Sequence, residues 1–135
     1  MPTEVSYSDS SASSTTIFFH TNITHSAVNE ISKGAVQSYL INSNKTLSGP
    51  IDTTGTGGNG PAFCTQLSNG VVAAVNYGSG NASFTATTID GTIFDQPTSF
   101  VNFPVLNKVS HPHMALEYKA EVFVPDLVSG RSVVF

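Results

Sequence analysis

From residue 16 onward, short apolar runs are separated by residues that favour turns, chiefly Gly, Asn, Asp and Pro. Each run has the length of a β-strand, and several are rich in β-branched or aromatic residues. The pattern predicts an all-β chain of about ten strands with no long helix, in which Ala27–Ile31 forms a helical turn at most. The predicted strands are TIFFH, AVQSYLI, FCTQL, VVAAVNY, ASFTATTI, TIFDQ, SFVNF, MALEY, EVFVPDL and SVVF.

Two of the intervening segments carry residues that accept a positive φ. Ser68-Asn69-Gly70 separates FCTQL from VVAAVNY, and Asp90-Gly91 separates ASFTATTI from TIFDQ. Both predict tight β-hairpins. The segment 55–60, GTGGNG, is too rich in glycine for the interior of a strand and is predicted to connect two sheets. A phosphate-binding loop is not favoured there, because neither Lys-Ser nor Lys-Thr follows and no helix begins behind it.

A weak internal repeat relates two parts of the chain at an offset of about 50 residues. This spacing is typical of one blade of a β-propeller, which has four strands in roughly 40 to 50 residues. Short polar residues at the ends of the matched strands are expected to hydrogen-bond the local backbone and stabilise the turns. The repeat superposes AAVNYGSG on FVPDLVSG, and its matched positions are Pro61 with Pro112, Asn76 with Asp126, and Ser79-Gly80 with Ser129-Gly130.

The repeat predicts an incomplete β-propeller over residues 16–135, about two and a half blades of four-stranded antiparallel sheet, preceded by a flexible polar leader at 1–15. The end of one blade is expected at about 16–54, a full blade at 60–104, and three strands of a third at 111–135. A self-contained β-sandwich of about ten strands fits the same strand count. In a partial propeller, exposed blade edges favour self-association.

The composition narrows the classes of partner. The net charge is −4, and the five Lys and Arg residues are scattered, so nucleic acid is not expected as a partner. No apolar run approaches the roughly 20 residues that span a bilayer, so no membrane is expected either. The N-terminus lacks a signal-peptide pattern, which predicts a cytoplasmic protein. The sequons at Asn22, Asn44 and Asn81 would suit secretion if an N-terminal exon were missing. Cys64 is predicted to be a small core residue.

Two stretches resemble consecutive blades of the seven-bladed lactonase propellers. NGPAFCTQLSNGVVAAVNYGSGNASFTATTIDGTI is similar to the second-blade signature of that family, and HPHMALEYKAEVFVPDLVSGRSVVF is similar to the blade that follows. The clear resemblance covers about residues 57–135, and residues 16–55 fit loosely as the preceding blade. The family contains bacterial 6-phosphogluconolactonases and fungal 3-carboxy-cis,cis-muconate lactonizing enzymes.

This resemblance implies an enzyme that opens or closes a lactone ring without a metal or cofactor. Its partner would be a small-molecule lactone or the open acid. It also implies that the chain is an N-terminal fragment, since the Arg and acidic active-site positions of later blades have no counterpart. Weak activity, or none, is therefore expected of this chain alone. The alternative is a non-catalytic truncated propeller, or a binding module that pairs through its edges.

His113 stands where the family has the inner-strand His of His-Pro-His, and the resemblance implies a catalytic role. An imidazole with a pKa of about 6.5 can exchange a proton with a lactone ring oxygen or a water. Alternatively, His113 only hydrogen-bonds the backbone of a neighbouring blade. His111 lies two residues earlier and would face the same side of a strand, as a substrate-binding residue. No metal site is predicted, because His20 and His25 lack the spacing to complete one.

Arg131 is a second candidate for binding substrate. Its guanidinium suits a carboxylate or a phosphate, although a single Arg in a loop is more often solvated. A serine nucleophile is not indicated, since the chain contains no Gly-x-Ser-x-Gly elbow.

Overall fold

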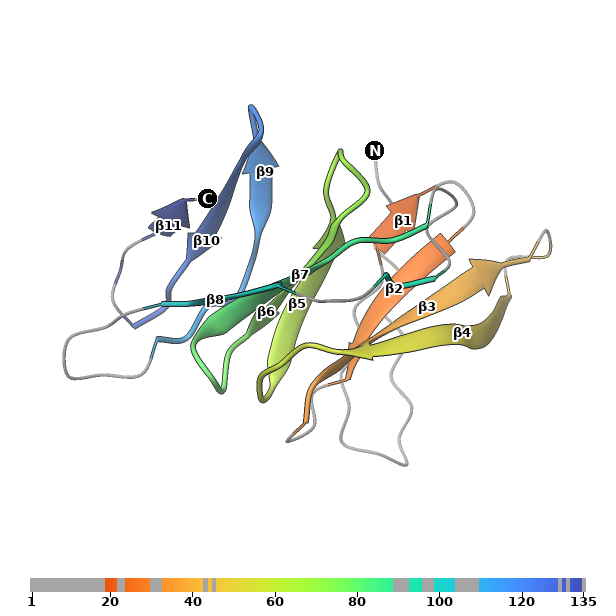
Figure 1. Ribbon diagram of the computed structural model, residues 1–135, viewed down its shortest axis with the longest axis horizontal. Helices are drawn as coiled ribbons and strands as arrows, with labels where there is room; N and C mark the ends of the chain where they lie inside the picture. The colour runs from red at the N-terminus through yellow and green to blue at the C-terminus, as the bar shows by residue number, and fades with distance from the viewer. Residues whose placement is uncertain are drawn as a thin grey trace.

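The computed structural model describes residues 19–21, 24–29, 33–42, 44, 46–88, 93–95, 99–103, 110–128, 130 and 132–134. These residues form eleven strands in three antiparallel sheets that lie side by side, in chain order, along the longest axis of the molecule (Figure 1). The predicted all-β class is confirmed. The described ranges contain no helix that is long and apolar enough to cross a lipid bilayer. The predicted leader at 1–15 lies outside the described residues.

The first sheet has four strands, of which two were not predicted. Thr24–Asn29 was expected to belong to a loop and a helical turn, but it pairs along its whole length with the next strand. The segment from Leu47 to Gly55 is also a strand, although Gly49 and Pro50 interrupt any alternating pattern. The sheet is therefore more complete than the expected end of a blade. Its strands, in spatial order, are β1 (Phe19–Thr21), β2 (Thr24–Asn29), β3 (Ala35–Ile41) and β4 (Leu47–Gly55).

The second sheet also has four consecutive strands. Its first hairpin is closed by the predicted Ser68-Asn69-Gly70 turn, in which the Gly70 nitrogen donates to the Leu67 carbonyl at 2.9 Å and Gly70 has φ of 85°. Asp90-Gly91 lies outside the described residues, and the predicted strand around Phe94 is reduced to an isolated bridge with Thr87. The strands are β5 (Pro61–Gln66), β6 (Val72–Asn76), β7 (Asn81–Thr85) and β8 (Ser99–Asn102).

The third sheet has three described strands in the spatial order β11-β10-β9. They are β9 (Leu116–Tyr118), β10 (Glu121–Pro125) and β11 (Ser132–Val134). A bridge between Pro112 and Asp126 extends the pairing of β9 and β10 toward the preceding loop.

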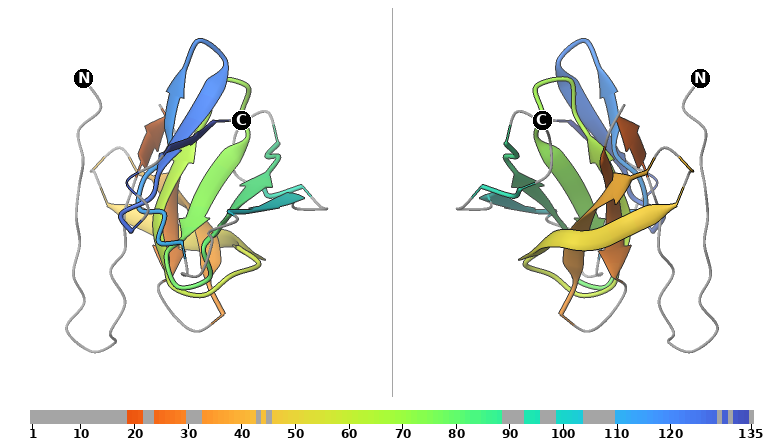
Figure 2. Two further views of the ribbon diagram at one scale, coloured as in Figure 1. Left: turned by 90° about the vertical axis from the view of Figure 1, so that its left-hand side faces the viewer. Right: turned by 90° about the vertical axis from the view of Figure 1, so that its right-hand side faces the viewer.

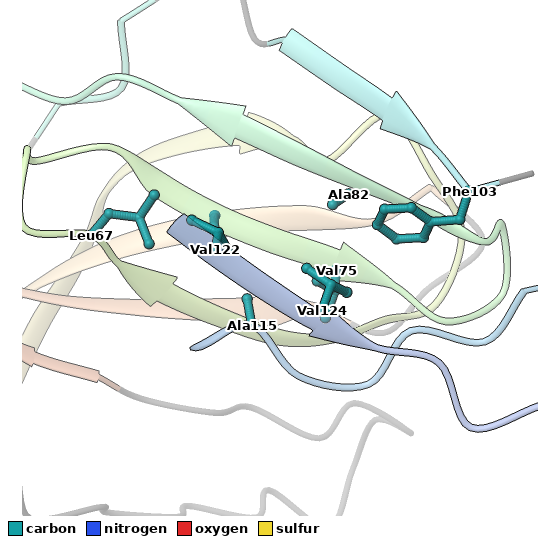
Figure 3. Packing of buried hydrophobic residues seen from close by; sticks show 8 residues of the cluster. Leu67, Val75, Ala82, Phe103, Ala115, Val122 and Val124 are labelled. Atoms are coloured by element: carbon teal, nitrogen blue, oxygen red, sulfur yellow. The ribbon is translucent and has the colours of Figure 1, made fainter. Parts of the chain in front are cut away.

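Alternate residues of β6 face the two neighbouring sheets, as the period of a strand requires. Val72 and Ala74 belong to a cluster with Val36, Cys64 and Phe94, which joins the first and second sheets. The third sheet lies next to the second, as the ribbon views show (Figures 1 and 2). On this other side of β6, a second cluster joins the two sheets (Figure 3). It contains Leu67, Ala73, Val75, Ala82, Phe103, Ala115, Val122 and Val124. The second sheet is thus apolar on both faces and lies between the other two.

The repeat read from the sequence is also a repeat of structure. Pro61 pairs with Asn76 at the start of the second sheet, and Pro112 pairs with Asp126 at the same place in the third. The turns that follow match as well, since Gly80 and Gly130 each donate a backbone hydrogen bond to the residue four positions earlier and have φ of 62° and 64°. The second and third sheets therefore repeat one structural unit.

Candidate functional site

The candidate site lies where the turn 77–80, between β6 and β7, meets the segment that leads into β9. The backbone nitrogen of Tyr77 donates to Gly60 at 2.9 Å, which fixes the turn against the connection between the first two sheets. Gly80 ends the turn with positive φ. The Tyr77 ring remains exposed at this point.

His111 is held against Tyr77 by two contacts. Its ring stacks on the tyrosine ring with the centroids 4.3 Å apart, and its Nδ1 lies 2.8 Å from the Tyr77 carbonyl oxygen. Because a carbonyl oxygen only accepts hydrogen bonds, Nδ1 must carry the proton and donate it. In the neutral ring, Nε2 is then left with its lone pair as an acceptor.

The side chain of Asp126 holds the backbone of His111 in place through hydrogen bonds. The buried carboxylate accepts hydrogen bonds from the His111 nitrogen at 3.0 Å, from the Val128 nitrogen at 2.9 Å and from the Ser110 hydroxyl at 3.0 Å. This confirms the expectation that Asp126 stabilises its turn. It also gives Asp126 a positioning role for His111, which the sequence did not indicate.

His113 contacts the same tyrosine from another direction. Its exposed ring lies edge-on to the Tyr77 ring, with the centroids 6.0 Å apart. Pro112, between the two histidines, is buried on the opposite side of the extended segment. The predicted pair His111 and His113 is therefore brought together around Tyr77, a residue that sequence reasoning passed over. Arg131, the third predicted site residue, lies outside the described residues.

A groove of about 490 Å³ is lined in part by Ser79 of the same turn. Its base is mostly glycine backbone, and Ser79 closes one end by accepting a hydrogen bond from the Asn59 nitrogen at 2.7 Å. A side chain at Gly58 would collide with Asn76, whose Cγ would lie 2.6 Å from the added Cβ. The lining residues are Lys33, Gly34, Gly55, Gly57, Gly58, Asn59 and Ser79.

Asn76 lies fully buried beneath this groove. Its Nδ2 donates to the Thr56 carbonyl at 3.0 Å and to Asn81 Oδ1 at 2.7 Å, whereas its Oδ1 has no hydrogen-bond partner in the described part of the chain. These contacts tie β6 and β7 to the connecting segment, so Asn76 has a structural role as predicted. Its described partners are the distant Thr56 carbonyl and the Asn81 side chain, however, and not the local backbone of its turn. Asn81 is itself buried on β7, which closes that sequon to a glycosyltransferase in the folded chain.

Among the residues that the structure describes, the other reactive side chains form no second catalytic or metal-binding centre. Cys64 is fully buried, and this burial raises the pKa of its thiol to about 12, which confirms it as a core residue. Within the described ranges, no three side chains of His, Cys, Asp or Glu converge to form a metal site.

No protein-family model matches the chain, and no curated protein sequence matches it. A solved structure does, the crystal structure of a "putative 6-phosphogluconolactonase" from Bacteroides fragilis. The TM-score is 0.76 at 18% sequence identity, and the match covers 99% of this chain and 48% of the other. The chain thus spans about half the length of the structure it resembles. Together with its three consecutive antiparallel sheets, this likeness shows that the chain has the fold of a partial β-propeller, as the repeat predicts, and not of a two-sheet sandwich.

Proposed function

We propose that this chain is part of an enzyme that opens or closes a lactone ring, and that the ring is bound beside Tyr77, His111 and His113. The observation that carries the proposal is the pair of imidazoles on one tyrosine, with the tautomer of His111 fixed by the Tyr77 carbonyl. The Bacteroides fragilis protein supports it, because that name describes an enzyme acting on a sugar-acid lactone.

Hydrolysis of a lactone requires one proton to be removed from the attacking water and one to be given to the ring oxygen. Water adds to the carbonyl carbon, the bond from that carbon to the ring oxygen breaks, and the product is a hydroxy acid. We assign this proton transfer to His113, whose exposed ring is open to a substrate. Closure of the same hydroxy acid, with release of water, would follow this path in reverse.

His111 is assigned to binding, because its Nδ1 donates to the Tyr77 carbonyl and the lone pair of Nε2 can accept a hydrogen bond from a substrate hydroxyl. The stack on Tyr77 holds the ring in place, so little side-chain freedom is lost when substrate binds. Arg131 is retained as a candidate partner for the substrate's carboxylate or phosphate.

The neighbouring groove provides space for the remainder of the substrate. It shares the turn 77–80 with the histidine pair, and its glycines leave backbone groups accessible. Since the chain spans about half of the similar structure, further groups for catalysis would come from the other half of the ring.

The test is turnover of 6-phosphogluconolactone and of a carboxymuconolactone by the 135-residue chain, measured through release of acid. We expect weak turnover, with kcat lowered by roughly a hundredfold or more in His113→Gln and KM nearly unchanged. His111→Gln should instead raise KM. Gln keeps a hydrogen-bonding group at both positions. The His113 variant therefore tests mainly the loss of proton transfer, and the His111 variant tests mainly the changed geometry of the hydrogen-bond acceptor.

Equal turnover in wild type and His113→Gln would refute the catalytic role. Absence of turnover with both lactones, combined with no binding of either open acid, would refute the lactone site altogether. In that case the apolar face of the third sheet would favour the second candidate, a non-catalytic module that associates with another chain.

A further inference from the structure

Two of the three sequons lie within the described residues, and their surroundings differ. The sequon at Asn44 lies in the turn that joins β3 to β4, where both Asn44 and Thr46 are exposed. The sequon at Asn81 lies on β7, where its residues Asn81, Ala82 and Ser83 are 7, 0 and 2% exposed. Of these two sequons, therefore, only the one at Asn44 is open to an enzyme in the folded chain.

The two groups that define the sequon at Asn44 are held close together. The Thr46 hydroxyl donates to Asn44 Oδ1 at 2.6 Å, and the Thr46 backbone nitrogen donates to the same oxygen at 3.1 Å. Asn42 also holds Thr46, because its Nδ2 donates to the hydroxyl oxygen at 2.9 Å and its backbone nitrogen donates to the Thr46 carbonyl at 2.8 Å. The acceptor amide and the hydroxyl two residues later thus lie side by side at the end of a hairpin.

The hydrogen bonds of the two sequons leave different atoms available. Both hydrogen bonds described for the Asn44 side chain end on Oδ1, whereas a sugar would be attached to Nδ2. In Asn81 both ends of the amide are engaged. Its Oδ1 accepts from Asn76 Nδ2 at 2.7 Å, and its Nδ2 donates to the Gly57 carbonyl at 3.4 Å. Modification of Asn81 would therefore require β7 to separate from its neighbours.

We propose that Asn44 is the acceptor of an N-linked oligosaccharide. In this transfer, Nδ2 attacks C1 of the first sugar of a lipid-linked oligosaccharyl pyrophosphate. The bond from C1 to the pyrophosphate oxygen breaks, the lipid pyrophosphate leaves with the electron pair, and Nδ2 gives up one proton to a base of the transferase. The proposal implies that the chain enters the secretory compartment, in which this transfer occurs. It does not rest on the lactone proposal.

A glycan at Asn44 would leave the candidate site open. β3 begins at Ala35 beside the groove, since the preceding Gly34 lines the groove and donates to the Gly58 carbonyl at 2.9 Å. It ends at Ile41, close to the sequon, and its seven residues span roughly 20 Å. In Figure 1, this end of the β3–β4 hairpin points to the right, away from the second and third sheets.

The experiment exposes the folded 135-residue chain to a purified oligosaccharyltransferase that accepts the plain sequon, together with a lipid-linked oligosaccharide. The product is then denatured and treated with a peptide N-glycosidase in ¹⁸O-water, which converts each modified Asn to a labelled Asp. Trypsin separates the three sequons, because Lys33, Lys45 and Lys108 place them in peptides 1–33, 34–45 and 46–108. Each rate of modification is divided by the rate of the same sequon in a synthetic peptide, which removes the difference between Thr and Ser sequons.

We expect Asn44 in the folded chain to react at a rate close to that of its peptide. Asn81 should react at least roughly tenfold more slowly than its peptide, because it becomes accessible only when the second sheet opens. Thr46→Ser is the matched variant, since it keeps a hydroxyl at an exposed position and makes both sequons of the Ser type. In this variant, Asn44 should still react ahead of Asn81. Asn44→Gln keeps an amide but not the sequon, and peptide 34–45 should then carry no label.

Two results would overturn the proposal. One is a loss of rate at Asn44 on folding that is as large as the loss at Asn81. The other is peptide 34–45 that carries no label when the chain purified from its natural source is treated with the same glycosidase. Labelled peptide 34–45 from that source, together with unlabelled Asn81, is the result that the proposal predicts.

Discussion

The carboxylate of Glu117, on β9, accepts two hydrogen bonds from Ser68, which belongs to the turn between β5 and β6. One comes from the Ser68 backbone nitrogen and one from its hydroxyl, each at 2.7 Å. The contact joins the third sheet to the second across 49 residues of chain. It adds a directional link to an interface whose core is made by apolar side chains.

This link should make the interface sensitive to acid. The hydrogen bonds from the Ser68 hydroxyl and backbone lower the pKa of Glu117 below its usual value of 4.5. A lowered folded-state pKa means that the contribution to stability is complete above about pH 4.5 and is lost as the pH falls through the folded value. We expect wild type to lose more thermal stability than Glu117→Gln between pH 6 and pH 3. Thermal melts of both, with Glu121→Gln as the control, measure this, and parallel pH curves would contradict it.

Burial of Cys64 in the second sheet should make the stability of the folded chain fall at high pH. Burial raises the pKa of its thiol from 9.0 to about 12, so above pH 9 the unfolded chain releases this proton before the folded chain does. Stability should therefore fall between pH 9 and pH 12 more steeply in wild type than in Cys64→Ala. In addition, a disulfide reagent at pH 8 should modify the folded chain far more slowly than the denatured chain. Equal modification rates would show that Cys64 is not in the core.

A single substitution in the turn between β9 and β10 should stabilise the folded chain. Lys119 and Ala120 both have positive φ, 51° and 65°, although neither is a glycine. Ala120→Gly removes that steric strain and should raise the free energy of unfolding by about 0.5–1 kcal/mol. Ala86→Gly, at an exposed position without positive φ, should instead lower it by about 0.5 kcal/mol. Urea titrations separate the two signs, and a loss of stability in Ala120→Gly would count against the turn as described.

Asp126 should couple stability to the histidine site. Asp126→Ala leaves two backbone N–H groups and the Ser110 hydroxyl without their acceptor, which should lower the free energy of unfolding by about 2–3 kcal/mol. Asp126→Asn keeps one acceptor oxygen and should lose about half as much. Only the Ala variant should also release His111 from its fixed tautomer, which nitrogen NMR of the imidazole detects. A stable Ala variant with an unchanged imidazole would exclude the positioning role.

Local chemistry accounts for the parts of this structure that the sequence predicts. The Ser68-Asn69-Gly70 turn was recognisable because Gly70 supplies the positive φ that the hairpin needs. The sequence also predicted that Pro61 matches Pro112 and that Asn76 matches Asp126. These residues occupy the same paired positions at the ends of strands in the second and third sheets, where only a few residue types fit. The strands β2 and β4 were missed, since their alternation is weak and each pairs with β3 along most of its length.

The sequence predicted two residues of the candidate site, His111 and His113, but neither Tyr77 nor the role of Asp126 in positioning His111. His111 and His113 carried a family-like motif, but Tyr77 lies 34 residues before His111 and meets it only because two consecutive sheets pack together. No local signal marks such a contact. The same holds for Asp126, whose role in fixing His111 follows from the bridge to Pro112 and not from its own neighbours in the chain.

The measurement that tests the central claim most directly is NMR of the histidine imidazoles, with and without 6-phosphogluconate, the open acid of the proposed lactone. In the free protein, His111 should appear as the Nδ1–H tautomer. Addition of the acid should shift the His111 and His113 signals together and leave His20 and His25, on β1 and β2, unchanged. Saturating acid that shifts neither His111 nor His113, or that shifts all four histidines alike, would contradict a lactone site beside Tyr77.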